Sequence, residues 1–384
     1  MLDTPPSRLS ASPLGVSAIV GLFALLLLGT YFRSPIQPPD AATWRSGHQL
    51  SALYDPPTRP VETLIGQGDG QIFVTQAQDP LLRRPELIRG GPAQQAYRFQ
   101  RPLSGWLGWV ASGGQGGAAP WALLVISALS VMALAGVTGR ICVRNGRSAA
   151  WGLLVPLFPG AFTDMTWVGP EALATTLVLA GLGLWAKDGR SRWGAVACFA
   201  LAGLTRESML LIPAALCAVE LYRRRSWRDI FVTASAAVPY VAWVGLLRLR
   251  LGALPGAVSG PRVSPLPFAG MLDRVPHWRP IDAIAAAAIL LPAVVAIVLR
   301  SDATLRVLIA VNLAFASILG SDVWSRFADF GRVLLPLSAL SLLALCGVSL
   351  SGRRSVVEVR GATGDDDEQI VGAVISGPLA EAQA

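Results

Sequence analysis

Charged residues are scarce in this chain. Aspartate, glutamate, lysine and arginine make up 15% of its 384 residues, whereas apolar residues make up 53%, and the mean hydropathy is +0.51. This composition excludes an ordinary soluble domain and predicts several membrane-spanning segments. Lysine is almost absent, because Lys187 is the only one. Such heavy use of arginine is typical of a bacterium with high genomic GC content.

Cysteine and histidine are also rare, with four cysteines and two histidines. The cysteines lie in or beside apolar runs or near basic turns, so neither a disulfide framework nor a zinc site is indicated. They are Cys142, Cys198, Cys217 and Cys346. The net charge of +8 requires no nucleic acid partner, since arginines that face anionic lipid headgroups account for much of it.

Ten apolar runs predict ten membrane spans. Their ranges are 14–32, 120–138, 149–163, 170–186, 193–205, 207–222, 229–248, 281–299, 304–320 and 332–350. After every second run comes a short basic turn or, at the end, a basic tail. The turns contain Arg140, Arg144 and Arg147; Lys187, Arg190 and Arg192; Arg223, Arg224, Arg225 and Arg228; and Arg300 and Arg306. The positive-inside rule makes this side cytoplasmic, together with both termini.

Two regions lie outside the apolar runs. The first extracytoplasmic loop, 33–119, contains enough apolar residues to fold against the bundle, and its part from Pro85 to Ser112 predicts short amphipathic helices in the headgroup layer. We expect one transmembrane domain over 1–350 that includes this loop. The tail, 351–384, is expected to be disordered in the cytoplasm.

Several predicted spans are shorter than the roughly 20 residues that cross a membrane. If their cytoplasmic ends lie at the surface, their outer ends stop below the outer headgroups. Charged connections at that depth are tolerated where they line a water-filled cavity or are buried in protein. The candidates are Asp164, Glu171, Arg206 and Glu207. The structural alternative is that Arg206 and Glu207 form ion pairs or extend to the interface.

A glycine-rich run, 66–73, follows the first span and surrounds Asp69. No strand precedes it and no lysine follows, so a nucleotide-binding loop is weakly indicated. Glycines that flank an aspartate are equally typical of a tight turn. The functional interpretation depends on position, because this run lies on the same predicted side as the recessed connections.

Four motifs, in their order along the chain, resemble those of a known family. They are Asp-Gly-Gln-Ile-Phe at 69–73, Tyr-Arg-Phe-Gln-Arg-Pro-Leu at 97–103, Leu-Thr-Arg-Glu at 204–207, and Trp324 and Asp329 followed by Arg-Val-Leu-Leu-Pro at 332–336. This chain resembles the polytopic glycosyltransferases of the GT-C fold, which use lipid-phosphate-linked sugars. It is most similar to bacterial members of the dolichyl-phosphate-mannose mannosyltransferase type that are implicated in cell-surface glycopolymer formation.

The resemblance implies an all-α GT-C-like bundle that transfers a sugar from a polyprenyl-phosphate donor to a glycan or lipid acceptor. Asp69 matches the family's first-loop aspartate and is the expected base, because a phosphate leaves readily without a general acid. Guanidinium groups bind phosphate bidentately. The candidate phosphate ligands are Arg98, Arg101, Arg206 and Arg332. The residues expected to line the cavity or contact the acceptor are Gln71, Asp164, Glu171, Glu207, Trp324 and Asp329.

Other interpretations stay open at this point. The carboxylates suit Mg²⁺ or Mn²⁺, but no spacing defines a metal site. A transporter or flippase of lipid-linked sugar would place charges near the midplane and often has inverted repeats, whereas here the charges fall on one side and no repeat is evident. A non-catalytic assembly subunit is the third interpretation, which the presence of Asp69 disfavours. The expected location is the bacterial cytoplasmic membrane, with an extracytoplasmic active site.

Overall fold

The apolar runs fold into helices. The computed structural model describes residues 11–33, 50–51, 59–66, 69–186, 191–223, 227–257, 263–299 and 302–350. Within these ranges there is no named strand, and the isolated bridges join Ser51 to Ile88 and Val263 to Leu319. The all-α class is therefore confirmed. The expected tail, 351–384, and the turn at Lys187 lie outside the described residues.

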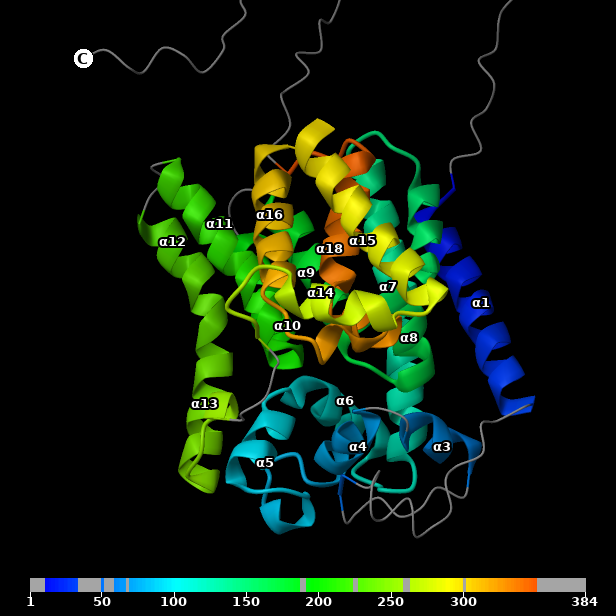
Figure 1. Ribbon diagram of the computed structural model, residues 1–384, viewed down its shortest axis with the longest axis vertical. Coiled ribbons are helices and arrows are strands. Elements are labelled where there is room, and N and C mark those ends of the chain that lie inside the picture. Colours follow the sequence, from blue (N-terminus) through cyan, green and yellow to red (C-terminus); the bar gives the residue numbers. More distant parts are fainter. Residues whose placement is uncertain are drawn as a thin grey trace, which may run out of the picture. The chain divides into compact units, whose positions relative to one another are not determined.

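The helices belong to an outer segment and a bundle (Figure 1). The outer segment comprises α3 (Pro60–Gly66), α4 (Gly70–Gln78), η2 (Pro85–Leu87), α5 (Pro92–Phe99) and α6 (Pro102–Ser112). The first half of the bundle comprises α1 (Pro13–Arg33), α7 (Ala119–Arg144), η3 (Ala149–Leu157), α8 (Pro159–Trp167), α9 (Glu171–Trp185), α10 (Ser191–Thr205), η4 (Glu207–Leu210) and α11 (Leu211–Tyr222). The second half comprises α12 (Trp227–Ala234), η5 (Ser235–Ala237), α13 (Val238–Leu251), η6 (Pro255–Ala257), α14 (Ala269–Arg274), η7 (Val275–His277), α15 (Pro280–Leu299), α16 (Ala303–Ser317), η8 (Val323–Ser325), α17 (Phe327–Val333) and α18 (Leu335–Leu345).

Helix length and composition indicate a membrane protein. Among the described residues, four helical stretches are long and apolar enough to cross a membrane: Pro13–Arg33, Ala119–Arg144, Trp227–Leu251 and Pro280–Leu299. The pair α17 and α18, bent by 62°, adds a fifth if it is one span. The apolar helices α9 and α16 have only 15 residues each, so the ten-span count stays a prediction.

One expected span is broken. The run 149–163 forms η3 and α8 instead of a single helix. The break lies at Phe158, which is extended (φ −68°, ψ 130°). A residue before proline avoids helical geometry, and Pro159 follows Phe158, so the chain ends one helix and begins another there.

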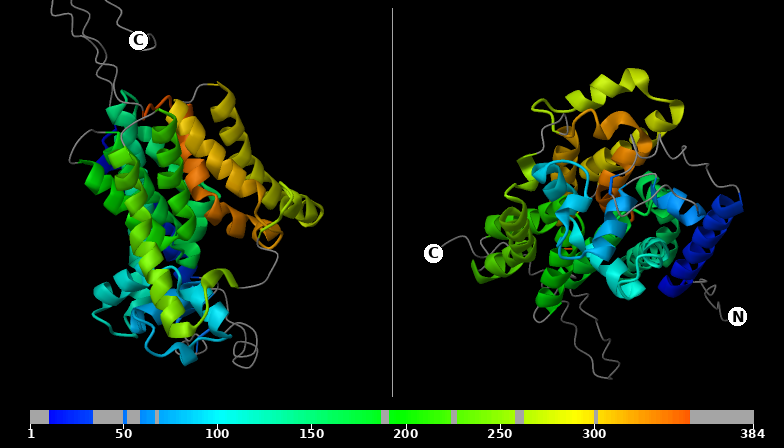
Figure 2. Two further views of the ribbon diagram at one scale, coloured as in Figure 1. Left: turned by 90° about the vertical axis from the view of Figure 1, so that its left-hand side faces the viewer. Right: turned by 90° about the horizontal axis from the view of Figure 1, so that it is seen from below.

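The outer segment lies at one end of the bundle, whereas the helix ends at the predicted basic turns lie at the other (Figures 1 and 2). The latter include the end of α7, the end of α11 with the start of α12, and the end of α15 with the start of α16. The alternation of basic turns with the other connections in the sequence therefore corresponds to the two opposite ends of this unit.

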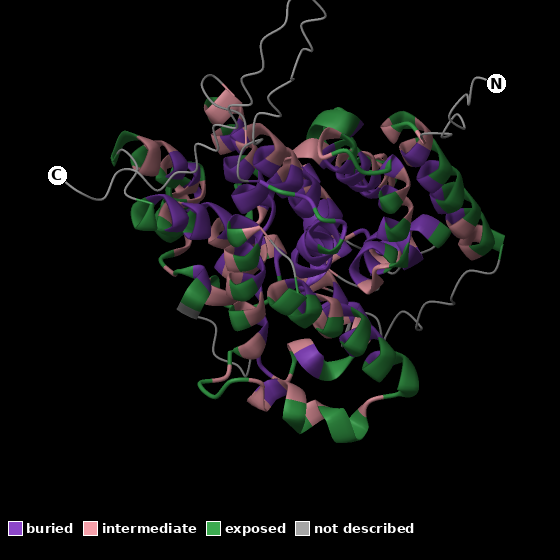
Figure 3. Cartoon of the chain, turned by 90° about the horizontal axis from the view of Figure 1, so that it is seen from above, coloured by how far each residue is buried: buried purple, intermediate pink, exposed green. Residues whose placement is uncertain are grey.

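The core is deepest around α18, where all residues from Leu335 to Ala344 are buried. Peripheral helices have exposed outward faces (Figure 3), and many of the exposed residues are large and apolar. On α1 these include Leu22, Leu25 and Leu26. Large apolar surfaces on long helices are typical of contact with lipid.

The described part of the outer segment packs on the bundle through two apolar clusters. In one, Phe73 and Val74 of α4 share a buried cluster with Leu123 of α7. In the other, Phe99 and Leu103 belong to a cluster with Trp243 and Leu247 of α13. The Trp243 indole N–H also donates to the Phe99 carbonyl at 2.8 Å. These contacts hold α4 to α6 over the ends of the bundle helices.

Candidate active site

An ion pair joins the outer segment to the bundle. Arg101, the residue before α6, donates to both carboxylate oxygens of Glu207 in η4, with N–O distances of 2.7 and 2.6 Å. Burial alone would lower the pKa of Arg101, but the charge and hydrogen bonds of Glu207 outweigh burial and raise it well above its ordinary value. Arg101 therefore carries a fixed positive charge beneath the outer segment.

A second, more deeply buried pair lies next to it. Arg206 contacts Glu171, the first residue of α9. Asp164 of α8 accepts a hydrogen bond from the Ala172 backbone N–H and is fully buried. The helix that begins at Glu171 directs its backbone donors toward these carboxylates, which favours negative charge there.

The turn between α8 and α9 brings the two carboxylates together. Val168 has a left-handed conformation (φ 55°, ψ 52°), which is strained for a β-branched residue. Next in the chain is Gly169, where an added Cβ would collide with both Asp164 Oδ1 and Glu171 Oε2. These two oxygens therefore face the same point of the turn, and only glycine leaves room for them.

A third group of charges comes from α17 and the start of α4. The Arg332 Nη1 lies 3.9 Å from Asp69 Oδ2, and its Nη2 lies 3.8 Å from Asp329 Oδ1. Asp329 is also held by Arg326, whose Nε donates to Oδ2 at 2.7 Å. The Trp167 ring lies near two guanidinium groups, 5.4 Å from Arg332 and 5.0 Å from Arg326, within the range of a cation–π interaction.

Close backbone packing places α17 against α8. An added Cβ on Gly160 of α8 would overlap the carbonyl group of Gly331, and one on Gly331 would lie 2.9 Å from Pro159 Cβ. This approach brings Arg332, the next residue, toward Asp164 and Arg206, with which it interacts electrostatically. Charges from α8, α9, α17, η4 and the outer segment therefore form one cluster.

The cluster opens beside Asp69 into a small pocket, the Asp69 pocket. It is lined by Asp69, Ile72, Phe73, Tyr97, Arg98 and Arg101. The free space is only about 20 Å³, so in this conformation the pocket holds the charged groups together rather than enclosing a sugar. The Asp69 side chain is half exposed, whereas that of Arg332 is 11% exposed. Asp69 is thus the carboxylate in the cluster that an external molecule can reach most readily.

Several buried polar atoms in the cluster make no hydrogen bond within the described part of the chain. They are Arg332 Nη1, Arg206 Nε, Asp164 Oδ1 and Glu171 Oε2. Buried polar groups normally have partners, because an unmade hydrogen bond is costly. Such a concentration of unmet donors and acceptors is typical of a site that binds a polar ligand.

Two residues predicted at the site use their polar groups elsewhere, and a third packs among aromatic rings. Gln71 is buried; its amide donates to the Gly66 carbonyl and accepts from the Leu50 N–H, which fastens the outer segment. Arg98 lines the Asp69 pocket, but its Nη1 donates to the Arg89 carbonyl at 2.6 Å. Trp324 does not face a cavity, because its fully buried ring packs with two other aromatic rings. These rings belong to Trp278 and Phe330.

The structural alternative for Arg206 and Glu207 holds in part. Both residues form ion pairs, but with Glu171 and Arg101 rather than with each other. Arg206 has extended backbone geometry (φ −156°, ψ 122°), in which successive side chains point in opposite directions. The two neighbours therefore join different parts of the cluster.

Sequence reasoning left Trp167 outside the site. Its ring lies 5.0 Å from the Arg326 guanidinium and 5.4 Å from that of Arg332. One signal in the sequence could have identified it. Trp167 comes three residues after Asp164, in a connection whose charged residues were already candidates for the site.

Among the described residues there is no group of three or more histidines, cysteines, aspartates or glutamates placed to hold a metal ion. Comparisons with known proteins give no match: no family model, curated protein or solved structure is similar to this chain.

Proposed function

We propose that this chain is a ten-span membrane glycosyltransferase with a GT-C-like fold. It transfers a sugar from a polyprenyl-phosphate donor to a glycan or lipid acceptor at the extracytoplasmic face of the bacterial cytoplasmic membrane. The observation that carries this proposal is the pairing of a half-exposed carboxylate, Asp69, with the buried guanidinium of Arg332, whose Nη1 lacks a hydrogen-bond partner among the described residues.

The charges suit an in-line displacement. The acceptor oxygen forms a bond to the anomeric carbon, while the bond from that carbon to the phosphate oxygen breaks and its electron pair leaves with the phosphate. Asp69 takes the proton of the acceptor hydroxyl. Arg332 and Arg101 stabilise the charge that develops on the phosphate. One displacement inverts the configuration of the anomeric carbon.

The other acids that pair with these arginines have a separate role. Glu207 and Glu171 hold Arg101 and Arg206 in position, and Asp329 holds Arg332. Three guanidinium groups that repel one another stay close together because each faces a carboxylate. The donor phosphate then meets guanidinium groups whose positions are already fixed.

Two neighbouring charges do not by themselves define the reaction, so the test must separate catalysis from transport. We would complement a deletion strain with wild type, Asp69→Asn or the control Asp322→Asn and measure the sugar composition of the cell surface. Asp322 is an exposed aspartate in the connection before α17 and does not line the Asp69 pocket. Membrane amounts of the three proteins are matched by immunoblot.

Wild type and Asp322→Asn should restore the missing sugar, and Asp69→Asn should restore on the order of a hundredth or less, as expected for loss of a general base. Full restoration by Asp69→Asn would refute the catalytic role of Asp69 and favour a flippase or an assembly subunit. Adding EDTA to a membrane assay with the restored activity would show whether Mg²⁺ or Mn²⁺ is required.

A further inference from the structure

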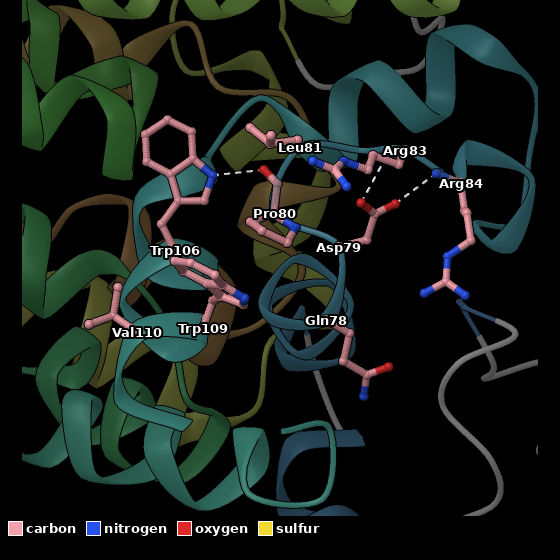
Figure 4. Close-up of a pocket in the computed structure, with 9 residues that line it drawn as sticks. All are labelled: Gln78, Asp79, Pro80, Leu81, Arg83, Arg84, Trp106, Trp109 and Val110. Carbon is pink, nitrogen blue, oxygen red and sulfur yellow. Dashed lines mark hydrogen bonds between the residues drawn. The ribbon is translucent and has the colours of Figure 1, made fainter. Parts of the chain in front are cut away.

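A second pocket lies in the outer segment, away from the ion-pair cluster. It has a volume of about 770 Å³ and shares no lining residue with the Asp69 pocket. We call it the Trp106 pocket. Its lining residues are Gln78, Asp79, Pro80, Leu81, Arg83, Arg84, Trp106, Trp109 and Val110. Figure 4 shows that they come from the end of α4, the turn that follows it, and one face of α6.

One wall of this pocket is apolar. Trp106 and Trp109 project from α6 toward Pro80 (Figure 4), and Val110 follows them on the same helix. The Trp106 indole N–H donates to the Pro80 carbonyl at 2.8 Å, which fixes the ring in place and uses its one donor. Val110 is 67% exposed and Trp109 is 45% exposed. Apolar side chains gathered around an open pocket are typical of a surface that binds an apolar group.

The opposite wall carries two cations. The Asp79 carboxylate accepts the backbone N–H groups of Arg83 and Arg84, both at 2.8 Å. These bonds close the turn that carries the two arginines, both of which line the pocket (Figure 4). No ion pair of either guanidinium occurs with another described residue. The pocket therefore offers several donors to an anion but few acceptors to a neutral ligand.

The pocket also lies where lipid headgroups are expected. From α6 the chain runs through a short turn into α7, whose apolar run begins at Ala119. Trp121, 47% exposed, marks the start of that run. Tryptophan is enriched at membrane interfaces. The pocket lies on the other side of the short turn that joins α6 to α7. A ligand with a charged head and an apolar chain fits both walls and this position.

We propose that the Trp106 pocket binds one anionic membrane lipid. Its phosphate lies against Arg83 and Arg84, and the first part of its hydrocarbon chain lies along Trp106, Trp109 and Val110. A neutral glycan fits less well, because it has no negative charge to pair with the guanidinium groups of Arg83 and Arg84. This proposal does not depend on sugar transfer, since no residue of the Asp69 pocket takes part.

The test measures lipid binding to the purified full-length chain by native mass spectrometry. Phosphatidylglycerol is compared with diacylglycerol, which has the same chains but no phosphate. Wild type should bind phosphatidylglycerol about tenfold more tightly or better, as expected for charge-assisted hydrogen bonds to a phosphate. The double variant Arg83→Gln/Arg84→Gln should lose this preference, and Trp109→Ala should weaken the binding of both lipids.

Matched controls separate the pocket from general contact with lipid. Arg89→Gln removes an exposed arginine of the same segment that does not line the pocket. Trp121→Ala removes a tryptophan with nearly the exposure of Trp109, 47% against 45%. Both controls should bind like wild type. Equal binding of the two lipids by wild type, equal losses in controls and pocket variants, or unchanged binding in the pocket variants would each overturn the proposal.

Discussion

Arg332 is the residue on which the chemistry of the site most depends. Its guanidinium lies between Asp69 and Asp329 at ion-pair distances of 3.9 and 3.8 Å, longer than a charge-assisted hydrogen bond. Its Nε donates to the Ala328 carbonyl at 3.2 Å, which fixes the plane of the group. A buried guanidinium that is oriented but incompletely bonded is suited to a ligand with two oxygens, such as a phosphate.

The activity of Arg332 variants should therefore depend on the shape of the new side chain as well as on its charge. Arg332→Gln should reduce sugar transfer by about a hundredfold, and Arg332→Lys should be clearly below wild type, because an ammonium cannot bind phosphate as a fork. Restored surface sugar in the complemented deletion strain gives the measurement. Arg140→Gln, at the opposite end of α7, is the control. Wild-type activity of Arg332→Lys would exclude bidentate binding by this residue.

The pair Arg101–Glu207 should contribute to stability as well as to binding. Arg101→Met or Glu207→Leu alone leaves one partly buried charge without its partner and should cost about 3 kcal/mol. The double variant should recover much of that loss. Thermal unfolding of the purified variants in detergent measures this coupling. Additive losses would mean that the two side chains do not interact in the folded protein.

At the scale of elements, the approach of α8 and α17 sets the positions of Asp164 and Arg332. Gly160→Ala places a methyl group against the Gly331 backbone, which cannot move aside as a flexible side chain can. We expect a loss of about 1–3 kcal/mol and a lower melting temperature. Gly245→Ala in α13, where nothing lies within 4 Å of the added group, should be neutral or slightly stabilising. Equal melting temperatures for the two variants would contradict this packing.

The presence of the helices could be predicted, because the length of each apolar run can be read from the sequence. Whether a run forms one continuous helix could not be predicted. Both breaks have a proline beside them in the sequence. Pro159 follows the break at Phe158, and the 62° bend between α17 and α18 lies next to a proline in the first turn of α18. Membrane helices often tolerate proline, so a proline within an apolar run does not by itself predict a break.

The charged residues of the site were predictable as a set, but their pairing was not. Sidedness placed Asp69, Arg101 and Arg332 at one end of the bundle. Which acid meets which base depends on local backbone conformation, as at Arg206, and on close helix contacts that only the folded chain creates. The role of Trp167 could not be predicted either, because its ring comes close to two guanidinium groups only when the chain has folded.

At the scale of the whole described unit, the proposed function requires the outer segment to face away from the cytoplasm. The Asp69 pocket lies between this segment and the bundle, so its side decides which leaflet supplies the donor. Basic residues concentrate near the opposite helix ends, which the positive-inside rule places in the cytoplasm. Opposite ends of α7 illustrate this, since α6 leads into its start and Arg140 and Arg144 lie near its end.

Cysteine labelling tests this orientation directly. In a variant without the four native cysteines, Gly117→Cys lies in the turn between α6 and α7, where nothing is within 4 Å of an added side chain. Tyr222→Cys replaces an 89% exposed residue at the end of α11. A membrane-impermeant maleimide should label Gly117→Cys in intact spheroplasts and Tyr222→Cys only after the membrane is permeabilised.

The reverse pattern would place the Asp69 pocket on the cytoplasmic side and remove the basis for an extracytoplasmic donor. Labelling of both positions in intact spheroplasts would mean that α7 to α11 do not cross an odd number of times. With the ten predicted spans, the two positions are separated by five crossings, so only opposite accessibility agrees with that count. This single comparison therefore tests both the side of the proposed active site and whether the number of crossings from α7 to α11 is odd.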